Sequence, residues 1–187
     1  MSTNPIVSVL ITSYNYGHYI SEAIDSVLAQ TYTDFELIIV DNGSEDDTAE
    51  IVKTYMLRDS RVKIHINESN IGMFRNYNKA LLLARGKYIK FLNADDTFHP
   101  ELLETFTQIL NNDSNISLVT SYRQHFQGSD ELLKQNISGL QNRKEMIIKG
   151  LLEGNFIGEP TTVMFRRDNL TVGLFDTSLL MVADHDM

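Results

Sequence analysis

Two adjacent carboxylates follow an apolar run that is typical of a buried strand. Residues 88–92 form the run, and Asp95 and Asp96 come shortly after it. Adjacent like charges raise the cost of ionising each other, so the pair favours a bound cation. Oxygen-only ligands suit a hard divalent ion, Mg2+ or Mn2+. One alternative stays open, because Asp96 or Thr97 is also placed to cap a helix predicted over residues 100–110.

The elements that must position this pair alternate along the chain. Short apolar runs separated by helical periodicity predict repeated β-α units and a mainly parallel sheet flanked by helices, which is an α/β fold. One helix, through Phe74 and Leu82, is expected to end at Gly86 as its C-cap. The polar stretch 124–142 is expected to be a long loop. The expected strands are 6–11, 35–40, 62–66, 88–92, 116–121 and 161–165, and a further short helix is expected over 143–152.

Polar side chains collect after three of these strands, at residues 12–15, 41–44 and 93–96. Ligands of open α/β sheets bind at the carboxyl ends of the strands, so the three segments predict one shared site. The turn after the first strand, 14–17, reads Tyr-Asn-Tyr-Gly and lacks both the dinucleotide fingerprint and the P-loop. A diphosphate would therefore enter such an acidic site only with a metal ion between the charges. These features together predict a nucleoside diphosphate held by a divalent cation.

Composition limits the possible partners. The chain has 187 residues, which favours one domain, and its net charge of −9 argues against binding nucleic acid or an anionic membrane. Without cysteine there is no disulfide, thiolate metal site or cysteine nucleophile. No signal peptide or transmembrane segment is evident, so we expect a cytoplasmic location, with a peripheral position at the inner face of the membrane left open for a longer protein.

Several ordered motifs resemble glycosyltransferase family 2. They lie at residues 7–15, 29–32, 35–44, 70–78, 92–96, 173–176 and 183–186. The resemblance implies a GT-A fold and inverting transfer of a sugar from a nucleotide-sugar, usually a UDP-sugar. The acceptor would be a hydroxyl of a saccharide or lipid-linked saccharide, in surface polysaccharide biosynthesis. We expect residues 1–187 to be one catalytic domain truncated at its C-terminus, with a nucleotide-sugar-binding half (1–122) and a partial acceptor-side half (123–187).

The resemblance also assigns roles to residues of the donor site. Thr12 and Tyr14 would wall the nucleoside pocket, and Asp41 would hydrogen-bond the base. The alternative for Asp41 is a turn residue, because Asp-Asn-Gly-Ser favours turns. Arg75, near Asn70, would reach the phosphates or ribose, although an exposed helix arginine is an equally valid interpretation.

The remaining roles concern the metal, the acceptor and the base. Asn93 occupies the first position of the family's D-x-D motif, where it would contact ribose but is a poor metal ligand. Asp95 is the first choice for the metal, with Asp96 beside it. Asp184 would be the base that deprotonates the acceptor, the alternative being a solvated charge near the chain end. Glu159 would contact the acceptor.

Three other functions compete with this one. A degenerate nucleotide-sugar-binding module would explain the uncharged Asn93. A nucleotidyltransferase would need a glycine-rich basic loop after the first strand, and residues 12–17 contain no Lys or Arg. A phospho-acceptor receiver domain would need its acidic pair where Thr12 and Ser13 stand.

Overall fold

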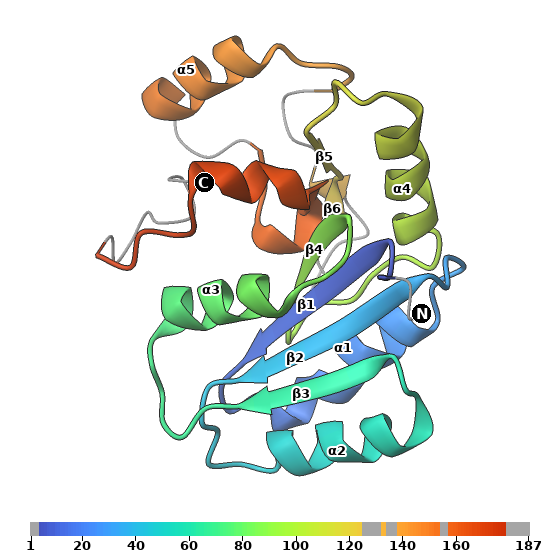
Figure 1. The fold of residues 1–187 in the computed structure, drawn as a ribbon, viewed down its shortest axis with the longest axis vertical. Coiled ribbons are helices and arrows are strands. Elements are labelled where there is room, and N and C mark those ends of the chain that lie inside the picture. The colour runs from blue at the N-terminus through green and yellow to red at the C-terminus, as the bar shows by residue number, and fades with distance from the viewer. Residues whose placement is uncertain (1–3, 125–131, 134–137, 154–156, 179–187) are drawn as a thin grey trace.

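The computed structural model describes residues 4–124, 132–133, 138–153 and 157–178. A central sheet of six strands in the order β3-β2-β1-β4-β8-β5 has helices on both faces (Figure 1). Its strands are β1 (Val7–Ser13), β2 (Phe35–Asp41), β3 (Val62–Ile66), β4 (Tyr88–Asn93), β5 (Leu118–Thr120) and β8 (Val163–Arg166). The helices are α1 (Gly17–Leu28), α2 (Thr48–Arg58), α3 (Met73–Leu83), α4 (Leu102–Asn112) and α5 (Arg143–Glu153), with 3-10 turns η1 (Pro160–Thr162) and η2 (Arg167–Val172).

The sheet is mainly parallel, as the alternating pattern predicts. Strand β1 pairs in parallel with β2 and β4, and β2 pairs in parallel with β3. Only β8 runs the other way, antiparallel to both β4 and β5. The α/β class expected from the sequence is therefore confirmed.

Two apolar layers form the core, one on each face of the sheet. Val9 and Ile11 of β1 pack in the layer that α1, α2 and α4 cover. Leu10, between them, points to the opposite layer, which α3 covers. A strand buried on both faces has no polar side to show, and this explains the nearly continuous apolar run that begins the chain.

The end of α3 differs from the expectation. The C-cap is Ala84 in an extended conformation, so the prediction of a C-cap at Gly86 is wrong. Gly86 instead lies against β1, where a Cβ would come within 2.4 Å of the Ser8 backbone nitrogen. A close approach of two backbone segments requires glycine as strictly as a helix end does.

The structure also decides the helix-cap alternative for the acidic pair. Helix α4 has its N-cap at Glu101, and Asp96 lies five residues earlier, in a turn where its backbone N–H donates to the Asn93 carbonyl. Capping by Asp96 or Thr97 is therefore wrong.

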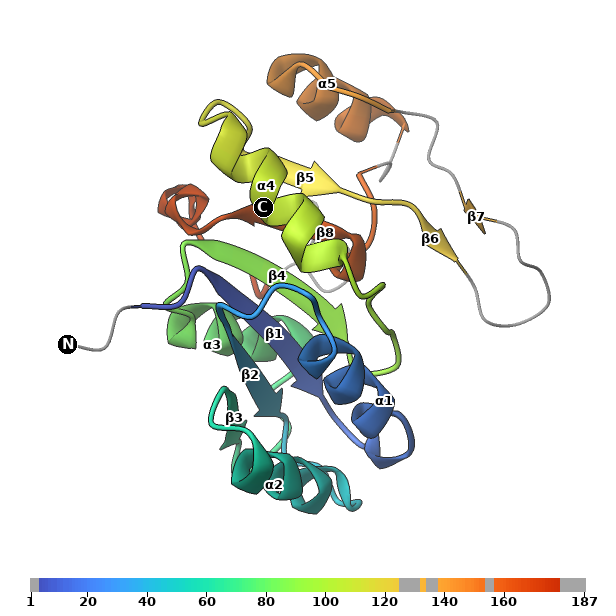
Figure 2. The ribbon, with the colours of Figure 1, turned by 90° about the vertical axis from the view of Figure 1, so that its right-hand side faces the viewer.

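The polar stretch after β5 holds two short strands, β6 (Arg123–Gln124) and β7 (Leu132–Leu133), which pair with each other and not with the central sheet. Figure 2 shows this pair projecting from the body, with α5 at the end of the molecule distant from β3. Among the helices that the structure describes, none combines the length and apolarity needed to cross a membrane.

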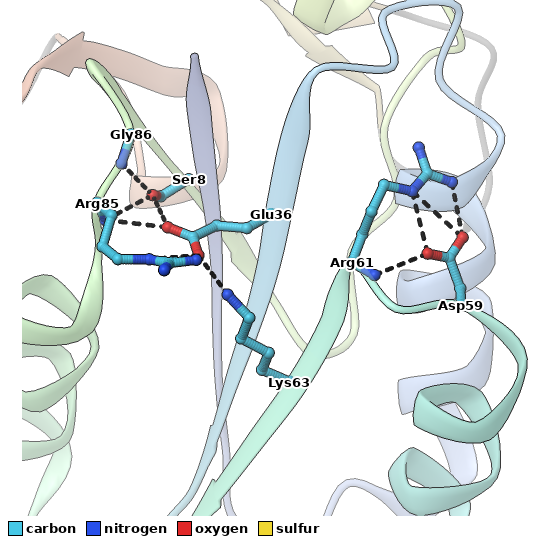
Figure 3. Close-up of polar contacts among 7 residues, drawn as sticks. All are labelled: Ser8, Glu36, Asp59, Arg61, Lys63, Arg85 and Gly86. Carbon is cyan, nitrogen blue, oxygen red and sulfur yellow. Dashed lines mark hydrogen bonds and ion pairs between the residues drawn. The ribbon is translucent and has the colours of Figure 1, made fainter. Parts of the chain in front are cut away.

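One buried carboxylate joins four segments at the amino edge of the sheet (Figure 3). Glu36 of β2 accepts hydrogen bonds from the Ser8 hydroxyl of β1 (2.8 Å) and from Lys63 Nζ of β3 (2.7 Å). The backbone N–H and the guanidinium of Arg85, just before β4, also donate to it, at 2.9 Å and 2.8 Å. Burial alone would raise the Glu36 pKa, but the bonds from Lys63, Arg85 and Ser8 outweigh it and lower the pKa to about 2.

We predict that Glu36→Gln lowers the free energy of unfolding at neutral pH by roughly 2 kcal/mol, because it leaves two cations without their buried partner. The folded-state pKa is depressed, so this contribution is complete above pH 4.5 and disappears as the pH falls toward about 2. Urea unfolding across that range should show the wild type and Glu36→Gln converging.

The matched control is Glu50→Gln, which removes an exposed pair with Lys53 on α2. Its effect should stay below about 0.5 kcal/mol at every pH. A constant gap between wild type and Glu36→Gln down to low pH would contradict the assignment.

Candidate functional site

The carboxyl ends of β1, β2 and β4 meet at one edge of the sheet. Register pairs Ser13 with Asp41 and Thr12 with Asn93, so the polar residues after each strand begin at the same level. The arrowheads of β1, β2 and β3 point the same way in Figure 1. The sequence prediction that the three polar segments share one edge is therefore confirmed for the described residues.

Backbone donors and short side chains hold together the two loops that follow β1 and β2. Asn15 has a positive φ of 59°, and its N–H donates to Ser44 Oγ at 2.9 Å. Its side-chain oxygen accepts from the Glu45 N–H at 2.9 Å, and the Gly17 N–H donates to Asp46 Oδ2 at 2.9 Å. The Asn-Tyr-Gly turn thus hydrogen-bonds the loop after β2, and it does not form a glycine-rich loop for phosphate.

Asp41 is completely buried at the centre of this arrangement. Its Oδ2 accepts from the Ser44 N–H at 3.0 Å, and its Oδ1 accepts from the Ser44 hydroxyl. The turn interpretation of Asp41 therefore describes its contacts in the structure. The Asp41 side chain is closed to solvent, whereas Tyr14 is exposed and Thr12 is half-buried.

A chain of asparagine side chains links β2, β3 and α3 next to Asp41. Asn67 Nδ2 donates to the side-chain oxygens of Asn42 and Asn76, both at 2.9 Å. Asn42 Nδ2 donates to Asn70 Oδ1 at 2.9 Å, and Asn76 Nδ2 donates to the Val40 carbonyl at 2.9 Å. Asn70, expected to bind the donor, therefore orients the loop that begins α3. Sequence reasoning missed this network, since no spacing rule links four amides in three separate segments of the chain.

The acidic pair after β4 has two different environments. Asp95 is exposed, whereas Asp96 is half-buried and its Oδ2 accepts from Asn93 Nδ2 at 3.0 Å and from Thr161 Oγ1 at 2.6 Å. Among the described residues Asp96 Oδ1 has no hydrogen-bond partner. One oxygen of Asp96 is therefore fixed by neutral donors while the other remains available.

Asn93 is engaged at both ends of its amide. Its Oδ1 accepts from the Tyr77 hydroxyl at 3.3 Å while its Nδ2 donates to Asp96. A carboxylate at this position would be unable to donate and would repel Asp96. The amide thus explains the departure from D-x-D in local terms.

Tyr16 brings the first loop to the acidic pair. The charge of Asp95 raises the pKa of the Tyr16 hydroxyl, with burial, Tyr19 and Asp96 adding to the effect. A neutral phenol beside two carboxylates is a hydrogen-bond donor for an anionic or hydroxylated ligand.

The carboxylate oxygens at this edge suit a magnesium-like ion that a bound ligand helps to hold. No group of three or more His, Asp or Glu side chains with metal-binding geometry occurs in the part of the chain that the structure describes. Mg2+ is commonly bound by one or two carboxylates together with substrate phosphates and water. Asp95 and the available oxygen of Asp96 match that set.

Within the described ranges, the structure does not bring the other expected site residues into contact with the acidic pair. Arg75 is exposed on α3 and forms no ion pair among the described residues. Glu159 is exposed and paired with Arg123, just before η1. Asp184, the expected base, lies outside the described residues.

Comparison with known proteins identifies the family to which this chain belongs. The family model for glycosyl transferase family 2 matches residues 8–173, so the chain belongs to this family. An uncharacterized protein of Mycobacterium tuberculosis is 35% identical over 97% of the chain and 60% of its own length. Glycosyltransferase GlyG of Streptococcus pneumoniae is 32% identical over 63% of the chain and 39% of its own length. The chain thus spans 60% or less of these relatives.

Solved structures confirm the GT-A architecture expected from the sequence. The S. aureus TarS 1-349 structure has a TM-score of 0.76 at 23% identity and covers 96% of this chain and 52% of its own. A mannosyltransferase from Pyrobaculum calidifontis, PcManGT, has a TM-score of 0.66 at 20% identity, covering 94% of this chain and 49% of its own.

We predict that Asn93→Asp lowers the unfolding free energy by about 1 kcal/mol in EDTA, because a donor to Asp96 becomes a second negative charge. Saturating Mn2+ should restore most of the loss by neutralising the cluster. Thermal unfolding in both conditions measures it.

Asn142→Asp is the matched control. It adds the same charge before α5, where its side-chain oxygen already accepts from the Lys144 N–H at 2.9 Å, a role that aspartate retains. Equal destabilisation of Asn93→Asp with and without Mn2+ would disprove a cation at this edge.

Proposed function

We propose that this chain is the donor-binding part of a metal-dependent, inverting glycosyltransferase that uses a UDP-sugar. The observation that carries the proposal is the meeting of Asp95 and Asp96 with the loops after β1 and β2 at one edge of the sheet, in a chain of glycosyltransferase family 2. Two neighbours of the same fold were solved with relevant ligands. One is TarS with UDP, and the other is PcManGT with GDP-Man and Mn2+.

Binding of the donor would divide between two sets of residues. The exposed ring of Tyr14, with Thr12 beside it, would wall the nucleoside, and Asp41 would accept from the base after Ser44 shifts. Asp95 and Asp96 would hold the divalent ion, which supplies Lewis-acid stabilisation of the departing diphosphate. Arg75, exposed and unpaired among the described residues, would contact the phosphates or ribose.

Transfer to the acceptor would need a base on the opposite side of the sugar from the diphosphate. Asp184 takes that role by its match to the family motif, accepting the proton as the acceptor hydroxyl attacks the anomeric carbon. Glu159 would lie toward the acceptor, a saccharide or lipid-linked saccharide of surface polysaccharide biosynthesis. Asn93 favours one second candidate, donor binding without transfer, because its uncharged amide leaves the motif with fewer carboxylates.

We predict that UDP binds at least tenfold more tightly with Mn2+ than with EDTA, and that Asp95→Asn abolishes this difference. The reason is that the exposed Asp95 carboxylate is the charge most accessible to a phosphate-bound ion. Isothermal titration calorimetry with and without Mn2+ measures both quantities.

Asp34→Asn serves as the matched control, because Asp34 is exposed at the opposite edge of the sheet. It should preserve the Mn2+ effect. UDP binding that ignores Mn2+ in the wild type would favour the module without transfer.

We also predict that Asp184→Asn lowers sugar transfer by about 10²–10⁴-fold while leaving the Kd for UDP and Mn2+ within twofold, because asparagine cannot accept the proton. Initial rates and calorimetry on the same preparations separate the two effects. Asp186→Asn should keep most of the activity. Loss of transfer in Asp186→Asn but not in Asp184→Asn would show that Asp184 is not the base.

A further inference from the structure

A lysine lies fully buried in the middle of β4, and the proposed function does not use it. Lys90 Nζ lies 4.8 Å from the ring centroid of Phe98 and 5.5 Å from that of Phe106. Burial lowers the Lys90 pKa well below its usual value, and the charge of Asp96 partly opposes this effect. An ammonium in such surroundings is costly unless its hydrogen bonds do something that an apolar side chain cannot.

Those hydrogen bonds go to one short segment. Lys90 Nζ donates to the Thr161 carbonyl and to the Val163 carbonyl, the latter at 3.3 Å. Both carbonyls belong to the passage from η1 into β8, the strand that pairs antiparallel with β4. The buried amino group of Lys90 therefore fixes the backbone of residues 161–163 against β4.

The same segment holds the acidic pair. Thr161 Oγ1 accepts from the Asn93 N–H at 3.0 Å and donates to Asp96 Oδ2 at 2.6 Å. Thr161 thus contacts Lys90 through its carbonyl and Asp96 through its hydroxyl. Lys90 Nζ is thus connected through Thr161 to Asp96 Oδ2. Because Oδ2 is fixed in this way, the direction of Asp96 Oδ1 is fixed as well.

We propose that Lys90 is a positioning residue for the cation site: through Thr161 it sets the orientation of Asp96 so that Asp96 Oδ1 faces the divalent ion. This inference rests on the proposed function, because it takes Asp95 and Asp96 as the ligands. Lys90 itself touches neither donor nor ion. Replacement of a buried charge by an apolar side chain of similar size is often neutral or stabilising. Lys90→Met is therefore expected to fold, and a lysine without a role at the cation site would leave ion binding unchanged when replaced.

The test compares Lys90→Met, Thr161→Val and the double variant. Both single variants should weaken Mn2+ binding to the UDP complex about tenfold, while the Kd for UDP in EDTA stays within twofold of the wild type. The double variant should be no weaker than either single one, because both changes break the same path. Calorimetry gives the affinities, and urea unfolding without metal gives the stability of each variant.

Thr107→Val is the matched control. Thr107 is buried on α4, and its hydroxyl has no hydrogen-bond partner among the described residues, so its removal should leave Mn2+ affinity unchanged. Wild-type Mn2+ affinity in Thr161→Val, or additive losses in the double variant, would overturn the proposal, even if Lys90→Met does not fold. If the wild type shows no Mn2+-dependent UDP binding, the proposed function fails first, and this outcome is distinct from failure of the path alone.

Discussion

Parallel pairing in register is the constraint on which the candidate site depends. Because Ser13 lies beside Asp41 and Thr12 beside Asn93, three polar loops leave the sheet at one level. Each loop then fixes the next: Asn15 binds the loop after β2, and Asn42 binds the loop before α3. A slip of one residue in a strand would turn its side chains to the other face and separate these partners. The chemistry at the edge is thus a consequence of strand register.

The opposite edge explains how that register is held. Glu36, Ser8 and Lys63 are each the second residue of their strands, and Arg85 and Gly86 lie just before β4, separated from it by Lys87. A single carboxylate with these partners aligns four neighbouring segments at their amino ends. The close contact of Gly86 with Ser8 adds a steric limit, since any side chain there would meet the β1 backbone. Alignment at the amino edge carries through the strands to the carboxyl edge, because their lengths are similar.

Sequence predicted the fold well, and part of the site. Strand and helix patterns placed β1 to β4, α3 and α4, because each has either an apolar run or a helical period of buried positions. The polar strand ends also identified the edge, since parallel strands must finish together. Three features required coordinates. Gly86 is required because the β1 backbone lies too close for a side chain, and not because of a helix end. Lys90 interrupts an apolar strand, and nothing in the neighbouring sequence explains it. Thr161 bonds Asn93 and Asp96 across 68 and 65 residues of sequence. Such long-range hydrogen bonds leave no periodic trace in the chain.

The two edges of the sheet treat their carboxylates in opposite ways, and this contrast bears on how a ligand would enter. At the amino edge Glu36 is neutralised by Lys63 and Arg85. At the carboxyl edge Asp96 is held by an amide and a hydroxyl, and among the described residues neither Asp95 nor Asp96 forms an ion pair. Lys90 is buried and donates to the Thr161 and Val163 backbone carbonyls, so it orients the site without occupying it. Neutral donors fix a carboxylate without cancelling its charge. The uncompensated negative charge at this edge therefore favours a cation that binds together with an anionic ligand. The cation would bind more weakly without that ligand, and the ligand would be repelled without the cation.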